Sequence, residues 1–443
     1  MSPASRGRKA KKRKKRPIGR PGAARGTTGG ARGSGGTAGG QLASLPAGAH
    51  ALAGSRRRPA WFDSSIRRVL DRAGVVMAAR GPRELEQATA ELLGAELHRV
   101  IGEEDHGMWF DWWFGELAEA AAARVRGDAA GAWQAPWRLL HGLTSIGSPA
   151  LASIAQTAIG RAGGEASKAQ QADAKRQQPA WLWKLPMITA TGEIWQMHDV
   201  HGTRLAVVAG FSYPGATDSS VFLFDIDACG PVSLAGAGVY ADVSQAAAAW
   251  RALVGEAAGG AQPAAVETAD DLRCLVDLDI GEETVVGTET RAVTDNWFRA
   301  RRRVHDLAGA LGRRGLALPE AGSVYHGIGT PPMAEAYARW HHERHDAEPD
   351  GEAVVALTEQ WLEGTLPGTE HSASPHRVAV QLDLIDDWRE DDPVTLAVKA
   401  LLPEWVRWHC EQAGLPEPLV ARSVAVAAGE EPRAASDCPA ARL

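Results

Sequence analysis

Cysteine is scarce in this 443-residue chain, which has only Cys229, Cys274, Cys410 and Cys438. They are widely separated and form no Cys-x-x-Cys pair, which argues against a zinc ribbon and against a disulfide framework. No apolar run approaches the roughly 20 residues that a membrane helix needs. The basic N-terminus is not followed by an apolar segment, so no secretory signal is predicted. We therefore expect a soluble cytoplasmic protein that has no membrane partner.

Three common enzyme motifs are also missing. The chain has no Gly-x-x-x-x-Gly-Lys-Ser/Thr, no Gly-x-Gly-x-x-Gly after an expected strand, and no Gly-x-Ser-x-Gly. These absences argue against the commonest nucleotide-dependent enzymes and against serine hydrolases. The sequence predicts no cofactor, and it favours a protein without enzymatic activity.

Acidic residues are absent from the first 60 positions, which hold 15 Lys and Arg. The remainder holds 33 basic and 54 acidic residues, a formal charge of −21. Residues 1–58 have little to bury, so we expect a disordered basic tail. Nucleic acid or another polyanion is its expected partner, because each cation near a phosphate releases counterions. The candidate nucleic-acid contacts are Arg8, Lys9, Lys11, Lys12, Arg13, Lys14, Lys15 and Arg16. The alternative is a solvated tail that has no partner.

The remaining chain predicts an α+β protein that is predominantly helical. Apolar residues recur at helical spacing over 59–165, which predicts a helical bundle or a loose HEAT-like stack. A polar linker over 166–185 precedes a small antiparallel meander and a helix at 186–255. The strands are expected near 192–198, 204–211 and 221–227. Residues 256–430 read as mostly helical, and 431–443 as a frayed tail.

Two aspartates end the most apolar strand, Val-Phe-Leu-Phe-Asp-Ile-Asp at residues 221–227. Asp225 and Asp227 are two apart, so they share one face, where carboxylates can bind Mg²⁺ and one can attack a phosphate. These seven residues resemble the opening motif of haloacid-dehalogenase-type phosphatases, which implies a metal-dependent phosphate-ester hydrolase. The pattern departs at Cys229, where that family has Thr or Val. Lys399 comes too late for its lysine, and the neighbouring strands predict a meander.

Histidines gather in Trp-His-His-Glu-Arg-His at residues 340–345. His341 and His345 are four apart on an expected helix, a spacing that lets two imidazoles share a metal. The Glu does not directly follow the first His of an H-E-x-x-H string, and no third ligand can be named. A helix end that favours protonated histidine is the alternative.

Tryptophan is abundant, with 16 residues against four tyrosines. Most are expected in the core, and the alternative is an exposed surface on which bases or a partner stack. The candidates for such a surface are Trp181, Trp183 and Tyr213. His198 to Gly202 fall at the first hairpin turn, where polar residues and glycine are expected.

Three functional hypotheses follow from these patterns. The favoured one is a non-enzymatic interaction or regulatory protein whose basic arm contacts nucleic acid. The second is a metal-dependent phosphate-ester hydrolase that uses Asp225 and Asp227. The third is a protein-binding adaptor that has an acidic helical body.

Overall fold

The structure of this protein is a computed structural model. It divides into Met1–Arg58 and Pro59–Leu443, and all elements below belong to the second unit. The eight basic residues from Arg8 to Arg16, most of the expected linker and the last ten residues lie outside the described part. The described residues are 58–103, 109–127, 133–165, 178–214, 219–230, 232–268, 272–276, 278, 289–315, 329–363 and 365–433.

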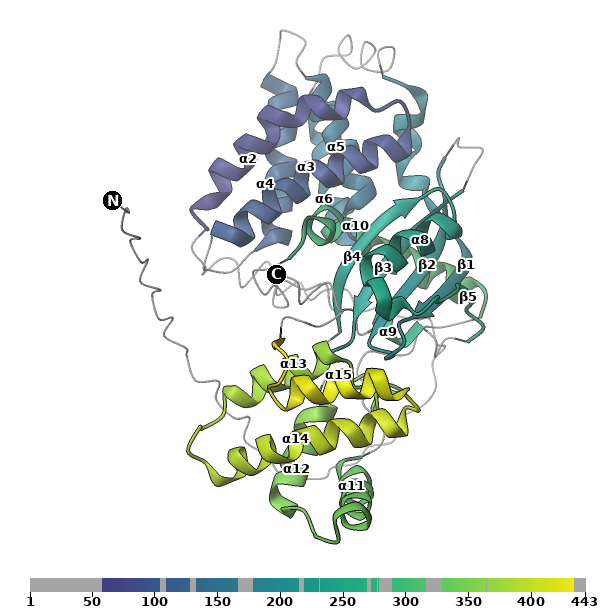
Figure 1. Cartoon of the computed structure of the whole chain (residues 1–443). Coiled ribbons are helices and arrows are strands. Elements are labelled where there is room, and N and C mark those ends of the chain that lie inside the picture. Colours follow the sequence, from purple (N-terminus) through teal and green to yellow (C-terminus); the bar gives the residue numbers. More distant parts are fainter. Residues whose placement is uncertain are drawn as a thin grey trace, which may run out of the picture. The chain divides into compact units, whose positions relative to one another are not determined.

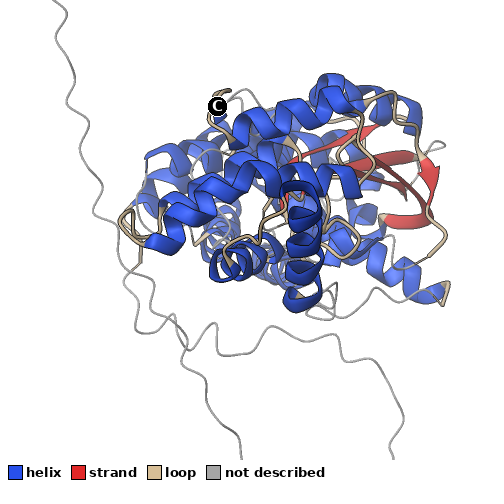
Figure 2. Cartoon of the chain, turned by 60° about the horizontal axis from the view of Figure 1, so that its bottom comes forward, coloured by secondary structure: helices blue, strands red, loops and turns tan. Residues whose placement is uncertain are grey.

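The predicted fold class is confirmed. The described chain is an α+β structure in which helices predominate and strands form one small sheet (Figure 2). No helix in the described part is long and apolar enough to cross a membrane.

The first helices follow the helical spacing of the apolar residues. They are α2 (Trp61–Arg72), α3 (Pro82–Glu103), α4 (Phe110–Gly127), α5 (Gln134–Ile146) and α6 (Pro149–Glu165), and the 3₁₀ helix η1 (Ala73–Ala78) follows α2. Proline stands first in α3 and α6, where its fixed φ suits a helix start and no N–H is needed. Gly147 is extended and separates α5 from α6. Helix α4 packs on α5 and α6, and α5 on α3.

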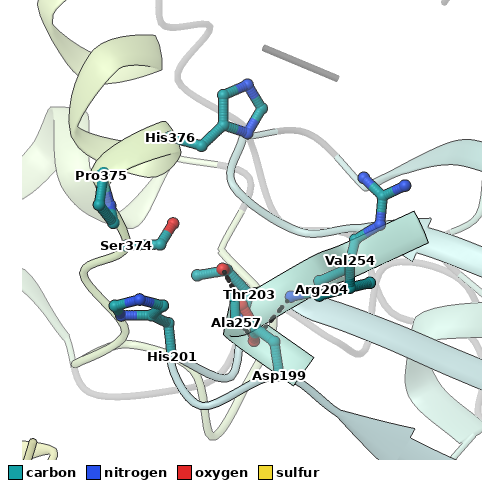
Figure 3. Close-up of a pocket in the computed structure, with 9 residues that line it drawn as sticks. All are labelled: Asp199, His201, Thr203, Arg204, Val254, Ala257, Ser374, Pro375 and His376. Carbon is teal, nitrogen blue, oxygen red and sulfur yellow. Dashed lines mark hydrogen bonds between the residues drawn. The ribbon is translucent and has the colours of Figure 1, made fainter. Parts of the chain in front are cut away.

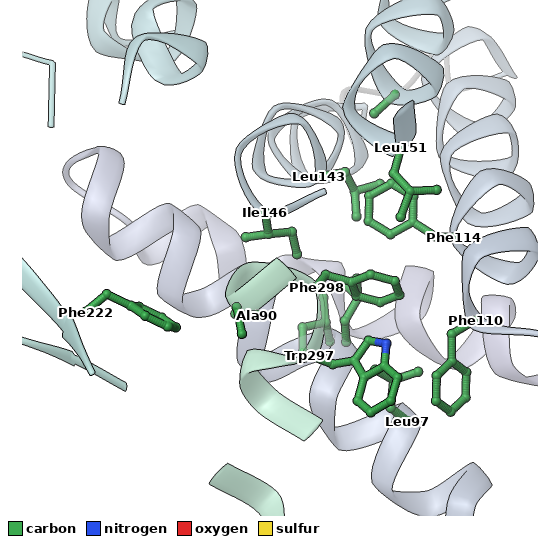
Figure 4. Packing of buried hydrophobic residues seen from close by; sticks show 14 of the residues in the cluster. Ala90, Leu97, Phe110, Phe114, Leu143, Ile146, Leu151, Phe222, Trp297 and Phe298 are labelled. Carbon is green, nitrogen blue, oxygen red and sulfur yellow. The ribbon is translucent and has the colours of Figure 1, made fainter. Parts of the chain in front are cut away.

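One later helix completes this core. Helix α10 (Arg291–Arg313) packs against α3, α5 and the sheet. Its Phe298 lies 4.8 Å from Phe114 and its Trp297 lies 5.5 Å from Phe110, measured between ring centroids (Figure 4). The contact between α10 and α3 is tight, because a Cβ on Gly94 would overlap Asp295. The larger core therefore depends on residues about 200 positions apart, such as Gln87 and Arg299.

The sheet has five antiparallel strands in the order β4-β3-β2-β1-β5. They are β1 (Thr189–His198), β2 (Arg204–Ser212), β3 (Ser220–Asp227), β4 (Ser233–Tyr240) and β5 (Ala264–Ala265). The predicted order of the first three strands is confirmed. Strands β4 and β5 were not predicted, because β4 is rich in glycine and alanine and β5 has two residues.

Both faces of β2 and β3 are covered, and the two strands have the near-continuous apolar sequences typical of strands buried on both faces. Val208 and Leu223 pack with Trp250 of α8 (Val243–Val254) on one face. Phe211 and Phe224 face the other way, into the core that contains α10. Figure 1 shows α8 lying across the strands.

The C-terminal helices have a core of their own. They are α11 (Thr330–His345), α12 (Gly351–Leu362), α13 (Pro375–Asp386), α14 (Pro393–Gln412) and α15 (Glu417–Ala427). Asp350, Ser374 and Asp392 cap the N-termini of α12, α13 and α14, each accepting a backbone N–H. The prediction that the C-terminal region is mostly helical is confirmed.

Half of the 16 tryptophans are buried in the core, and seven more are partly buried against it. Trp113, Trp250, Trp361 and Trp405 are fully buried. Of the candidates for an exposed aromatic surface, Tyr213 is buried and Trp181 is half-buried. Only Trp183 is well exposed, at 43%.

Burial of His141 makes the stability of the fold sensitive to acid. His141 lies between Trp137 and Trp183, and burial lowers its pKa to about 4. Between pH 6.5 and 4 the unfolded chain binds a proton that the native state excludes, so stability falls as the pH falls. We expect acidification from pH 7 to 5 to lower the free energy of unfolding of the wild type by about 2 kcal/mol more than that of the variant His141→Leu. Urea unfolding at both pH values measures this difference, and an equal loss in the two proteins would contradict it.

Candidate functional site

The two aspartates singled out in the sequence meet a buried arginine. Arg204, the first residue of β2, donates from Nε to Asp225 Oδ1 at 2.6 Å and from Nη2 to Asp225 Oδ2 at 2.7 Å. The Trp250 indole N–H also donates to Asp225 Oδ1, at 3.1 Å. The Arg204 and Asp225 side chains are only 3% and 2% exposed. Both Asp225 oxygens are therefore engaged inside the protein.

Asp227 has a different environment. Its Oδ1 accepts the backbone N–H of Cys229 at 2.8 Å, while Oδ2 lies 3.4 Å from Arg204 Nη1 and 3.4 Å from His376 Nδ1. Burial alone would raise the pKa of Asp227, but the positive charges of His376 and Arg204 outweigh it and hold the pKa below its ordinary value. Asp227 is therefore an ionised carboxylate that is held by weaker contacts than Asp225.

The histidine comes from a distant part of the chain. Ser374 accepts the N–H of Arg377 at 3.1 Å and caps α13, and Pro375 is the first residue of that helix. His376 follows in the first turn and faces Asp227. Cys229 Sγ lies 3.5 Å from Ser374 Oγ, a contact that spans 145 residues.

One polar turn lies beside this cluster. Asp199 accepts the N–H groups of Thr203 at 2.8 Å and of Arg204 at 3.1 Å, which closes the hairpin between β1 and β2. Gly202 has a φ of +70°, which favours glycine at this turn. Asp199 is therefore a structural turn residue, as the position of His198 to Gly202 predicted.

A small cavity separates this turn from α13. Figure 3 shows Asp199, His201 and Thr203 from the turn beside Ser374, Pro375 and His376 from α13. The cavity has a volume of about 10 Å³, which is the space of one water molecule. It is too small for a phosphate ester.

The structure departs from what the phosphatase resemblance implies. Strand β3 lies between two antiparallel neighbours, whereas the resemblance implies parallel strands joined by crossovers. Asp386 belongs to an Asp-Asp pair that could mimic the late acidic motif of that family, but it forms ion pairs with Lys399 at 2.8 Å and Arg433 at 2.6 Å. It lies ten residues beyond His376 on α13, which is about 15 Å along a helix.

Among the described residues, no third ligand joins His341 and His345, the two histidines that the sequence suggested as metal ligands. The His341 and His345 rings lie 4.5 Å apart, but His341 Nδ1 contacts the Ala347 carbonyl and His345 Nε2 contacts Glu404. Within the described part of the chain, only Asp227, Cys229 and His376 bring three ligand atoms within 4.8 Å of one another. Cys229 had been noted only as a departure from the phosphatase pattern, and Arg204 and His376 had not been singled out.

A larger concave surface lies along the edge strand β4. It encloses about 740 Å³ between β4, α3 and α10, which is within the range of ligand sites. Its lining is mixed in charge, with Arg83 and Arg299 near Glu91 and Asp295. Asn296 donates to the Ala237 carbonyl at 2.7 Å, so one backbone group of the edge is already satisfied.

Comparison of the chain with protein-family models, with curated proteins and with solved structures finds no significant match. The functional argument therefore depends on the residues themselves.

The turn beside the cluster has a pH dependence of opposite sign to that of His141. Burial raises the pKa of Asp199 to about 6, against the lowering effect of its backbone hydrogen bonds. Between pH 4 and 6 the native state therefore holds a proton that the unfolded chain releases. The stabilisation that this proton gives the native state falls as the pH rises. We expect the free energy of unfolding of Asp199→Asn, taken relative to that of the wild type, to be about 2 kcal/mol higher at pH 7.5 than at pH 4.5.

Urea unfolding of the two proteins at both pH values measures the Asp199 effect. Asp63→Asn on the exposed side of α2 serves as the matched control. A difference between Asp199→Asn and wild type that does not change with pH would contradict the assignment.

Proposed function

We propose that this protein is a non-enzymatic interaction protein whose basic N-terminal arm binds nucleic acid. The observation that carries the proposal is the charge distribution: 15 Lys and Arg without one acidic residue in the first 60 positions. The rest of the chain has a formal charge of −21, which repels a polyanion. Any binding to phosphates is therefore expected through the arm.

The geometry at Asp225 supports this proposal over the hydrolase alternative. A carboxylate that acts as a nucleophile or holds Mg²⁺ needs an oxygen that faces the substrate or the ion. Both oxygens of Asp225 instead accept hydrogen bonds from Arg204 in a nearly inaccessible position. The adjacent cavity, about 10 Å³, does not hold a phosphate ester.

The arm should bind by charge and not by sequence. If the eight basic residues from Arg8 to Arg16 each neutralise one phosphate of duplex DNA, the binding constant should fall with a log–log salt slope of about −7. Removal of residues 1–58 should abolish binding. Fluorescence anisotropy with two unrelated duplexes across a salt series measures both effects.

Two matched variants distinguish the effect of charge on nucleic-acid binding from the effect of residue identity. Exchange of every Lys for Arg and every Arg for Lys within residues 8–16 keeps the charge and should preserve affinity, whereas Gln at the same eight positions should remove it. Equal binding by the truncated and intact proteins would place any nucleic-acid contact in the folded body. No binding by either at low salt would favour the adaptor alternative, for which the surface along β4 is the candidate.

A further inference from the structure

The end of strand β3 and the start of helix α13 bring together a thiol, an imidazole and a carboxylate. Asp227 is the last residue of β3, Cys229 follows two residues later, and His376 is in the first turn of α13. Their ligand atoms lie within 4.8 Å of one another. Asp and Cys are fixed relative to each other, because the Cys229 N–H donates to Asp227 Oδ1.

The spacing fits a coordination site better than a hydrogen bond. His376 Nδ1 and Asp227 Oδ2 are 3.4 Å apart, whereas a charge-assisted N–H···O bond is about 2.7–2.9 Å long. Zinc binds nitrogen at about 2.0–2.1 Å and carboxylate oxygen at about 2.0–2.2 Å in a tetrahedron. Two such ligands lie about 3.3–3.5 Å from each other. The observed separation therefore matches one edge of that tetrahedron.

The charges around the cluster leave Asp227 able to bind a cation. Arg204 makes its two short hydrogen bonds to Asp225, and its Nη1 lies 3.4 Å from Asp227 Oδ2. Asp227 and Cys229 place a carboxylate and a thiol together beside His376. One thiolate and one carboxylate together neutralise a divalent ion.

The donor types select the metal. Thiolate and imidazole are ligands for zinc, whereas Mg²⁺ and Ca²⁺ take oxygen ligands. The groups around the donors are those of a metal site: a backbone N–H and Arg204 contact the carboxylate, and Ser374 Oγ lies 3.5 Å from Cys229 Sγ. The adjacent cavity, which His376 lines together with Ser374, has a volume of about 10 Å³, the space of one water molecule.

We propose that Asp227, Cys229 and His376 bind one zinc ion, with water as the fourth ligand, and that this ion ties the end of the sheet to helix α13. This proposal departs from the sequence-based expectation of no metal, and it is independent of the basic arm.

Zinc content tests the proposal directly. The full chain is treated with chelator, incubated with excess zinc, freed of unbound metal and measured by atomic emission. We expect about one zinc per chain, and a thermal midpoint about 3 °C higher at a free zinc concentration of 100 times Kd. A wild-type chain that retains no zinc and shows no shift overturns the proposal, whatever the variants do.

Two variants and a control locate the ion. Cys229→Ser and His376→Gln should each lose the zinc and the midpoint shift, whereas His345→Gln, at the other histidine candidate, should retain both. Cobalt loading adds a reading of the ligand type, because a thiolate-to-cobalt absorption band should appear in wild type and be absent from Cys229→Ser. Zinc retained by both Cys229→Ser and His376→Gln, or lost from His345→Gln, overturns the assignment of the site.

Discussion

The buried guanidinium of Arg204 is the constraint on which the centre of the structure depends. It binds Asp225 through two short hydrogen bonds on the face of the sheet that α8 covers. A buried charge without its partner costs several kcal/mol. Strands β2 and β3 must therefore keep the register in which Arg204 lies opposite Asp227 and can reach Asp225. A second buried arginine serves the other face, where Arg303 of α10 binds both oxygens of Glu86 of α3 at 2.6 Å. Ion pairs thus fix the sheet register on one side and the helix packing on the other.

This arrangement gives the two aspartates different roles. Asp225 is a structural carboxylate that Arg204 and Trp250 hold in place. Asp227 reaches beyond the sheet toward His376 and Cys229, the only other described residues with which it forms a possible three-ligand group. The same strand end therefore supports the sheet with one carboxylate and reaches α13 with the other. Nothing in this division of roles requires the basic arm, whose proposed binding depends on charge alone.

Local sequence patterns predicted most of the helices and strands but not the residues that pair with one another across the fold. Helical spacing, helix-start prolines and turn glycines predicted most helices and the first three strands, because these signals are local. Strand β4 was missed since its Ser-Leu-Ala-Gly-Ala-Gly-Val-Tyr sequence is rich in glycine and alanine and has only one β-branched residue, Val239. The spacing of Asp225 and Asp227 drew attention to them in the sequence, but the partners that define their chemistry lie on β2 and α13. The contact between Cys229 and Ser374 spans 145 residues, and no local sequence pattern predicts it.

A double-mutant cycle between Arg204 and Asp225 tests the central claim most directly. Arg204→Met should lower the free energy of unfolding by about 3–5 kcal/mol, because it leaves Asp225 charged and buried. Adding Asp225→Leu should restore at least about 2 kcal/mol, since it removes the stranded charge. Urea unfolding of the wild type, both single variants and the double variant gives the coupling energy. A double variant whose loss equals the sum of the two single losses would contradict the account.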